Sequence, residues 1–391
     1  METYLYSRAS IISSGILELP PVKPGNTGSI KFIPELPDSN NGEIWLTVSF
    51  QNKESTAWAP SGHEVAWFQH PLKSSPITLP SSSRFPVRIE GSKLYHTIIG
   101  SSFEIAFSRS TGGLTSWISQ GRQLLDVDET TDSALAPGFW RPPTDNDMPW
   151  TLGERRRYGL DDMRLQLRSM KISQSSEDSV VVFTETWAGP PVLAWSFIAR
   201  TTYTINGDGT ICIETHLLPK GSVPSELPRM GLDLRLVNDL DNATWFGLGP
   251  GESYPDKKRS QKLGIFKANT DQLHTEYEVP QEGGNRSETR WLRMTDGRGW
   301  GIVACRESVE SDKDTTTQFQ WAASRYSAKD IESAEHPCDL VRGKIIHVRL
   351  DAECSGVGTG ACGPPTLEKY LVACEERTFK FSLAPYFGDG F

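Results

Sequence analysis

The sequence predicts an all-β protein. Apolar and polar residues alternate in many short segments, and residues 43–50, Glu-Ile-Trp-Leu-Thr-Val-Ser-Phe, show this pattern plainly. Turn-forming residues are abundant, with 34 glycines and 26 prolines, most of them between the alternating segments. Helical patterns are few and short. Short strands joined by such turns are typical of a β-sandwich or a closed antiparallel barrel, whereas a (β/α)₈ barrel needs a regular alternation of strands and helices.

The same patterns place the individual elements. A hairpin is predicted from 201–205 to 210–216, because the intervening Asn206-Gly-Asp-Gly209 tolerates the positive φ of a tight turn. Helices are expected at 154–167, 328–334 and 366–370. Alternation predicts strands at residues 43–50, 103–107, 180–187, 211–215, 230–237, 345–350 and 379–383.

Composition excludes several classes of protein. The chain has 391 residues with 40 Lys and Arg against 49 Asp and Glu, a net charge of −9, whereas a duplex-binding protein needs a basic face. No apolar stretch reaches the roughly 18 residues of a membrane span, and the first twenty residues predict no signal peptide. The six scattered cysteines favour reduced thiols over a disulfide framework, and hence a cytoplasmic location. Two glycosylation sequons, at Asn242 and Asn285, keep secretion as the alternative.

A domain boundary is expected where Ser and Pro become dense, at residues 73–87. We therefore expect a small N-terminal domain over residues 1–72, a linker over 73–92, and one large domain over 93–391.

Five motifs carry a resemblance to a known family. In chain order they read GFWRPPTDND from Gly138, WFGLGPGESYPD from Trp245, TEYEVPQEGGNRSETRW from Thr275, SRYSAKDIESAEH from Ser324, and GVGTGACGPPTL from Gly356. In this order they resemble the C-terminal domain, or small chain, of the glycoside hydrolase family 2 β-galactosidases, from about Lys93 to the end. Residues 30–67 resemble the later half of the sandwich domain that precedes it.

The resemblance implies a fold and an activity. The fold is a large antiparallel two-sheet super-sandwich, related to the galactose mutarotases, preceded by a partial immunoglobulin-like sandwich. The activity is retaining hydrolysis of a terminal β-galactoside, which requires two carboxylates about 5 Å apart. In the family both are glutamates on an upstream (β/α)₈ barrel, so we expect no catalytic residue in this chain and no activity from it alone. A barrel-bearing chain or a second copy is the expected partner. The magnesium and sodium ions of the family are expected mostly on that barrel, with no cofactor here.

The resemblance also implies a contribution to the sugar pocket. Many members carry a tryptophan in the loop that here reads GVGTGACGPPTL, at the position of Cys362 before Gly363. A tryptophan face stacks on a sugar and provides a large contact area, and a thiol provides far less. Cys362 and Gly363 are therefore candidate substrate-binding residues.

A second candidate site is the run from Trp140 to Asp147. Trp140, Arg141, Asp145, Asn146 and Asp147 could line the sugar pocket, with Arg141 and Asp145 bonding hydroxyl groups. The structural alternative is a Pro-rich turn in which the Asp and Asn side chains cap backbone amides and pair with Arg141. A cation bound by the two aspartates is a weaker hypothesis, because no wider ligand set accompanies them.

Other carboxylates are interpreted as structural. Glu252 and Asp256 lie in a Gly- and Pro-containing loop that does not fix their spacing. Of Asp351 and Glu353, one could reach a sugar, although a salt bridge is at least as plausible.

Two further functions stay open. One is a carbohydrate-binding or assembly module without chemistry. The other is an aldose-epimerase-like enzyme, in which His216 or His274 would have to meet a glutamate in a cleft.

Overall fold

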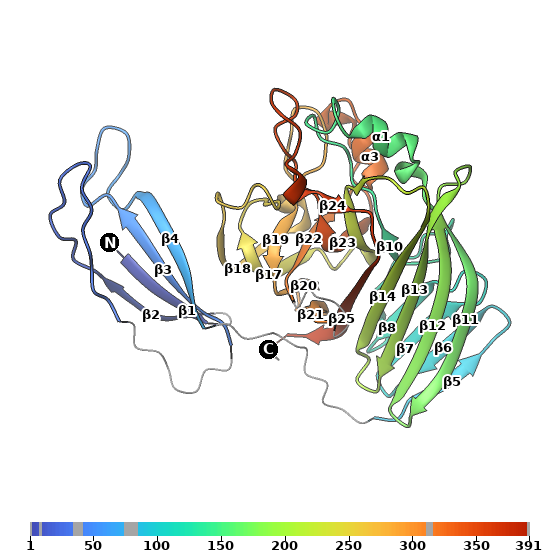
Figure 1. The fold of residues 1–391 in the computed structure, drawn as a ribbon. Coiled ribbons are helices and arrows are strands. Elements are labelled where there is room, and N and C mark those ends of the chain that lie inside the picture. The colour runs from blue at the N-terminus through green and yellow to red at the C-terminus, as the bar shows by residue number, and fades with distance from the viewer. Residues whose placement is uncertain (1, 8–9, 34–41, 74–84, 310–315, 389–391) are drawn as a thin grey trace. The chain divides into compact units, whose positions relative to one another are not determined.

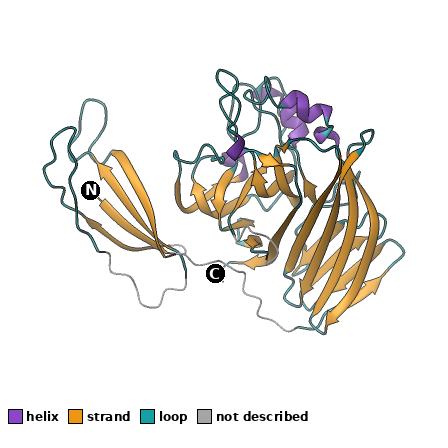
Figure 2. Cartoon of the chain, in the orientation of Figure 1, coloured by secondary structure: helices purple, strands orange, loops and turns teal. Residues whose placement is uncertain are grey.

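A computed structural model describes residues 2–7, 10–33, 42–73, 85–309 and 316–388 (Figure 1). Contacts divide the chain into two units, residues 1–77 with 262–265, and residues 78–261 with 266–391. The all-β prediction is confirmed, because antiparallel strands form both units and the helices are short (Figure 2). Among the described residues, no helix has the length and apolar character that crossing a membrane requires.

The first unit contains one four-stranded antiparallel sheet of order β2-β1-β3-β4. Strand β3 confirms the prediction for residues 43–50, whereas β1, β2 and β4 were not predicted. The bounds are β1 (Glu2–Ser7), β2 (Ser10–Ile16), β3 (Ile44–Gln51) and β4 (Glu64–Lys73).

The predicted linker, residues 73–92, lies partly outside the described residues, which resume at 85. Within it, strand β5 (Arg88–Gly91) pairs with β6 (Tyr95–Ile99). These two strands begin a five-stranded sheet of order β5-β6-β7-β8-β9, completed by β7 (Phe103–Ser108), β8 (Leu114–Ser119) and β9 (Arg122–Gln123).

Two further sheets form most of the rest of the second unit. One has nine strands in the order β11-β12-β13-β14-β25-β21-β20-β17-β18, and the other has five in the order β10-β16-β23-β22-β19. The nine-stranded sheet comprises β11 (Arg164–Ser176), β12 (Ser179–Gly189), β13 (Trp195–Asn206), β14 (Ile211–Gly221), β25 (Arg377–Phe387), β21 (Trp300–Glu307), β20 (Trp291–Thr295), β17 (Asn242–Gly249) and β18 (Lys262–Asn269). The other comprises β10 (Leu135–Gly138), β16 (Arg229–Val237), β23 (Ile345–Cys354), β22 (Phe319–Ser324) and β19 (Arg286–Thr289), while β15 (Glu226–Leu227) and β24 (Val372–Ala373) form a separate pair.

These sheets pack on one apolar core. Successive strand residues point to opposite faces, so the apolar set of each alternating strand is buried together. Trp245 of β17 meets Trp321 of β22 with ring centroids 5.3 Å apart, and Phe107 of β7 meets Tyr203 of β13 at 5.0 Å. The predicted strands of this unit are confirmed as β7, β12, β14, β16, β23 and β25.

The hairpin prediction is also confirmed, because β13 and β14 pair through a turn at Asn206–Gly209. Asn206 N–H donates to the Thr210 carbonyl at 3.0 Å, and Gly209 has φ +84°, where glycine is favoured.

The helix predictions are mixed. Helix α3 (Ala328–Ser333) is confirmed, and residues 366–370 contain only the 3₁₀ turn Glu368–Tyr370. The prediction of one helix over 154–167 is wrong. Helix α1 covers Leu152–Arg157, a 3₁₀ turn covers Leu160–Asp162, and β11 starts at Arg164. Gly159, at φ +66°, ends the helical path, and pairing with β12 outweighs the helix propensity of the next residues.

Candidate functional site

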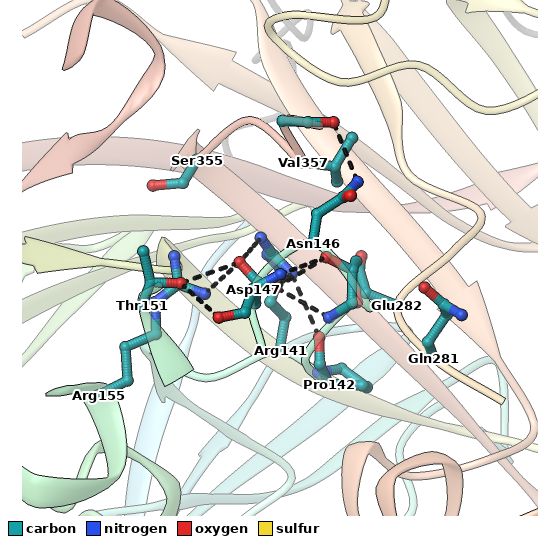
Figure 3. A network of polar contacts seen from close by, with 12 residues as sticks. Arg141, Pro142, Asn146, Asp147, Thr151, Arg155, Gln281, Glu282, Ser355 and Val357 are labelled. Carbon is teal, nitrogen blue, oxygen red and sulfur yellow. Dashed lines mark hydrogen bonds and ion pairs between the residues drawn. The ribbon is translucent and has the colours of Figure 1, made fainter. Parts of the chain in front are cut away.

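The run after β10 folds around a buried ion pair. Asp147 and Arg141 are 3% and 1% exposed, and Arg141 Nη1 donates to Asp147 Oδ2 at 2.8 Å (Figure 3). The same oxygen accepts from the Thr144 N–H at 2.8 Å, so it caps the turn that follows the two prolines. The structural alternative describes this arrangement, and a direct contact of Arg141 or Asp147 with a sugar stays a prediction.

A second arginine completes the charge balance at Asp147. Arg155, from α1, donates from Nη1 to Asp147 Oδ1 at 2.8 Å (Figure 3). Burial opposes ionisation of the carboxyl, but the guanidinium groups of Arg141 and Arg155 outweigh it and hold the pKa of Asp147 well below its usual range. Asp147 is therefore ionised at neutral pH and fixes the loop to α1.

The network continues from α1 to strand β15. Arg155 Nε donates to Glu226 Oε1 at 3.0 Å, and burial raises the pKa of Glu226 although Arg155 partly offsets the effect. A lowered and a raised carboxyl pKa can mark an acid/base pair. Here Arg155 holds both carboxylates, and neither lines the cavity along β11 to β13 or the cavity over β16, β22 and β23, so the pair is structural. Sequence reasoning missed Arg155 and Glu226, which lie 71 positions apart.

Asn146 ties this loop to the fifth motif. Its Nδ2 donates to the Gly358 carbonyl at 3.0 Å, and its Oδ1 accepts from the Ala361 N–H at 3.0 Å. Trp150 adds a bond from Nε1 to the Gly360 carbonyl at 3.1 Å. A Cβ on Gly360 would lie 2.5 Å from the Asn146 carbonyl oxygen, so only glycine permits this approach. We call the two segments, residues 141–151 and 356–367, the loop clasp.

The fifth motif is also held from its other side. Asp256 accepts from the N–H groups of Val357, at 3.1 Å, and Gly358, at 2.7 Å. Asp256 thus has the structural role expected for it. Cys362 is exposed and Gly363 half-buried at the tip of this anchored loop. Their predicted contact with a sugar is untested, but the loop that carries them is firmly supported.

We expect the Asn146→Ala substitution to loosen the loop clasp. The side chain makes two of the bonds between the segments, so its loss costs about 1–3 kcal/mol of local stability. Hydrogen exchange of the amides of residues 356–363 should accelerate. The matched control is Asn242→Ala, because Asn242 binds only its neighbour Asp241 through its side chain. Unchanged exchange in Asn146→Ala would contradict the clasp.

Glu252 of the second motif and Glu282 of the third each accept hydrogen bonds from a basic side chain and from hydroxyl groups. Glu252 accepts from Lys257 Nζ at 2.6 Å, Tyr277 Oη at 2.5 Å, Thr275 and the Gly284 N–H. Burial opposes its ionisation, but these donors lower the pKa of Glu252 below its ordinary value. The surroundings of Glu252 therefore agree with its structural interpretation.

Glu282 forms a bidentate pair with Arg349 of β23. Its oxygens accept from Arg349 Nη1 at 2.7 Å and Nη2 at 2.5 Å, and from the Tyr254 hydroxyl at 3.1 Å. Neither Glu282 nor Arg349 was among the predicted site residues. The link joins the third motif to the five-stranded sheet.

The remaining acidic candidates are also bound by neighbouring side chains. Asp351 is buried and accepts from Arg229, and Glu353 accepts from Arg377 Nε at 2.9 Å. Asp145 is exposed and accepts from Gln281 Nε2 at 3.1 Å. Because arginines occupy Asp147, the two-aspartate cation hypothesis does not fit this donor set. Throughout the described ranges, no group of three or more His, Cys, Asp or Glu side chains is placed to hold a metal.

Trp140 lies between two cavities. A cavity of about 750 Å³ extends along β11 to β13, and another of about 360 Å³ lies on the sheet formed by β10, β16, β23, β22 and β19; Trp140 and Asp233 line both. Figure 1 shows β10 between these two regions. Of the predicted site residues, Trp140 alone contributes to these two cavities.

Neither histidine of the epimerase-like hypothesis meets a free glutamate in these cavities. His216 Nε2 lies 2.7 Å from Glu376 and lines neither cavity. His274 lines the smaller cavity together with Glu282, but Arg349 and Tyr254 already occupy that carboxylate.

Comparison with known proteins assigns both parts of the chain. The family model described as "Beta galactosidase small chain" matches residues 99–383, and that described as "Beta-galactosidase, domain 4" matches residues 2–73. Among solved structures, a putative aldose 1-epimerase from Escherichia coli K12 has a TM-score of 0.39 at 12% identity, over 77% of this chain and 99% of that one. A GalM/aldose epimerase homologue from C. elegans also has a TM-score of 0.39, at 9% identity, over 78% of this chain and 100% of that one.

Curated relatives carry the same family name. A "Beta-galactosidase" of Kluyveromyces lactis is 29% identical over 337 residues, covering 85% of this chain and 31% of that protein. Another, of Priestia megaterium, is 28% identical over 323 residues, covering 82% of this chain and 29% of that protein. The chain thus spans about a third of the length of these relatives. With most of its second unit matched, this chain belongs to the β-galactosidase small-chain family, and a β-galactosidase domain 4 precedes that region.

Proposed function

We propose that this chain is the small-chain part of a β-galactosidase and presents the loop of residues 356–367 to a terminal β-galactoside. The observation that carries the proposal is the loop clasp. Asn146, Trp150 and Asp256 hold the backbone of that loop, while Cys362 at its tip stays exposed. A loop held in this way can form one wall of a sugar pocket without reorganising when the sugar binds.

The catalytic carboxylates belong, in this proposal, to another part of the enzyme. A retaining glycosidase needs a nucleophile and an acid with a raised pKa, about 5 Å apart. The carboxylates of Asp147, Glu252 and Glu282 are each bound by an arginine or lysine. A carboxylate engaged in this way is not free to act as nucleophile or acid. The partner in this proposal is a barrel-bearing large chain, or a second copy of this chain in a homo-oligomer.

Cys362 sets the sugar selectivity of the wall. A thiol has a smaller contact area than an indole, so the loop stacks weakly on a galactose ring.

All six cysteines are unpaired, which supports a cytoplasmic location for the protein. We also propose that residues 1–72 form a small N-terminal domain, residues 73–92 a linker and residues 93–391 one large domain.

A chimera tests this function. The region of the Kluyveromyces lactis relative that matches this chain is replaced by the corresponding residues of this chain, and folding is checked by circular dichroism. We expect the chimera to hydrolyse a chromogenic β-galactoside, and the Cys362→Trp variant to raise its kcat/KM about tenfold, equivalent to about 1.4 kcal/mol of stacking. A folded chimera without turnover, or with an unchanged kcat/KM in the variant, contradicts the proposal.

A further inference from the structure

We propose that the cavity of about 360 Å³ on the sheet of β10, β16, β23, β22 and β19 binds one neutral sugar in its pyranose form. We call this cavity the sheet cavity. No residue of 356–367 lines it, and the proposal does not depend on bond cleavage by any part of the enzyme. Its volume of about 360 Å³ lies at the lower end of the range of small-molecule sites, which suits a ligand of one ring.

The floor of the sheet cavity is the outer face of β16, β22 and β23. Along β16, Leu232, Leu234 and Leu236 point into the core, so the alternate residues Asp233 and Arg235 face the other way. The register places Arg349 opposite Asp233, and Ala136 and Ala322 end this row on the neighbouring strands β10 and β22. Small residues at both ends of a polar row leave room above the sheet.

The next row of the floor has the same character. His347 of β23 pairs with Arg235 on one side and with Ser324 on the other. The floor is thus hydrogen-bonding over two adjacent rows. An apolar ligand would cover this polar floor without hydrogen-bonding to it, at a cost in affinity.

The charges of the sheet cavity cancel in pairs. Arg229 donates to Asp233, Arg349 donates to Glu282, and Arg235 Nη1 donates to Asp128 at 3.0 Å. All six of these side chains line the cavity. A charged ligand would compete with an ion pair that is already formed. A polyol can instead hydrogen-bond to the donor and acceptor positions that these pairs leave unoccupied. This pairing favours a neutral ligand over an anion or a cation.

Three further polar side chains are available to a ligand. Within the described ranges, the side chains of His274, Tyr326 and His347 have no hydrogen-bond partner, and all three line the sheet cavity. Burial lowers the pKa of both histidines, so at neutral pH each offers one donor and one acceptor. Alternating donors and acceptors are what the hydroxyl groups of a sugar require.

Aromatic rings form the walls. Trp140 stands on one side, with Nε1 bonded to Glu332 of α3 at 3.2 Å. Tyr326 forms another wall and packs edge-on against His274, with ring centroids 5.3 Å apart. Aromatic faces pack on the C–H face of a pyranose and shield its hydrogen bonds from water. Three of the five motifs thus contribute walls to one cavity: the first with Trp140, the third with Glu282, and the fourth with Tyr326.

Binding to the full chain tests the proposal. Galactose, glucose and the anionic analogue galacturonic acid are titrated into the purified protein, with calorimetry and the fluorescence of the tryptophans as readouts. We expect saturable binding of a neutral sugar and at least tenfold weaker binding of galacturonic acid. The His347→Ala and Tyr326→Phe variants should each weaken binding about tenfold.

Matched controls separate a local from a general effect. His216→Ala and Tyr95→Phe remove the same groups outside the sheet cavity and should leave binding unchanged. Ala322→Met fills the floor and should abolish binding; if it does not fold, the other two cavity variants decide. Absence of saturable binding, preference for the anion, or equal effects of cavity and control variants overturns the proposal. The chimera readout is turnover and this one is binding, so either proposal can fail alone.

Discussion

Replacing Asp147 with asparagine is expected to lower the free energy of unfolding by about 3–5 kcal/mol. The side chain of Asp147 is 3% exposed and lies between Arg141 and Arg155, which are 0% and 3% exposed. The amide keeps the shape of the side chain but removes its charge. Two buried guanidinium groups would then lack their shared anion, which is the costly way to break a buried ion pair.

The pH dependence follows from the lowered pKa of Asp147. Unfolding returns its pKa to about 3.9, so the stabilisation is fully present above that pH and is lost as the pH falls toward the lower folded value. The wild-type protein should therefore lose its advantage over Asp147→Asn between about pH 5 and pH 2. Urea unfolding followed by tryptophan fluorescence measures both effects.

The control for this variant is Asp145→Asn, two positions earlier. Asp145 is exposed and bonds only to Gln281, so the change should stay within about 0.5 kcal/mol. Equal stability of the two variants would show that the Arg141–Asp147–Arg155 network contributes nothing to the fold.

The second large effect is expected at Glu282. Glu282→Gln leaves the Arg349 guanidinium, 14% exposed, without its bidentate partner, and should cost about 3–5 kcal/mol of unfolding free energy. Arg349→Met should cost a similar amount, because the carboxylate of Glu282 is then buried with only the Tyr254 hydroxyl as a side-chain donor. The double variant should cost about 1–3 kcal/mol less than the sum, since it removes both charges.

Unfolding of the four proteins in urea completes this cycle. Glu278→Gln, an exposed change in the same segment, is the matched control and should be neutral. Strictly additive losses would contradict a coupled pair. Because Glu282 and Arg349 also line the sheet cavity, the same variants should weaken sugar binding there.

The strands were predictable because the alternation of apolar and polar residues in the sequence matches the alternation of core-facing and outward-facing side chains in the sheets. In β16 and β23, apolar residues at every second position face the core, and nothing in the local sequence opposes a strand. Residues 164–167 show the opposite case. A helical pattern there is overridden by the pairing of β11 with β12, which single-sequence patterns do not reveal.

The candidate site was predictable only where its contacts are local. The pair of Arg141 and Asp147 spans six positions and was among the alternatives from the start. The bond from Asn146 to Gly358 spans 212 positions, and that from Glu282 to Arg349 spans 67. Such contacts depend on how the sheets bring loops together, so the loop clasp and the sheet cavity became visible only in three dimensions.

One short segment links the two functional proposals. Trp140 faces the sheet cavity, Arg141 anchors the buried network, and Asn146 holds the 356–367 loop. A change in one part of this segment can therefore reach the others through the backbone. We therefore expect ligand binding in the sheet cavity and sugar binding at the 356–367 loop to affect the same segment, residues 140–146.

The central claim is that this chain supplies a wall of the sugar pocket and not the reacting carboxylates. Hydrolysis of a chromogenic β-galactoside by the purified chain, measured beside the chimera, tests it most directly. The account predicts turnover by the chimera and none above background by the chain alone. Turnover by the chain alone that disappears when one of its own carboxylates is replaced would contradict it.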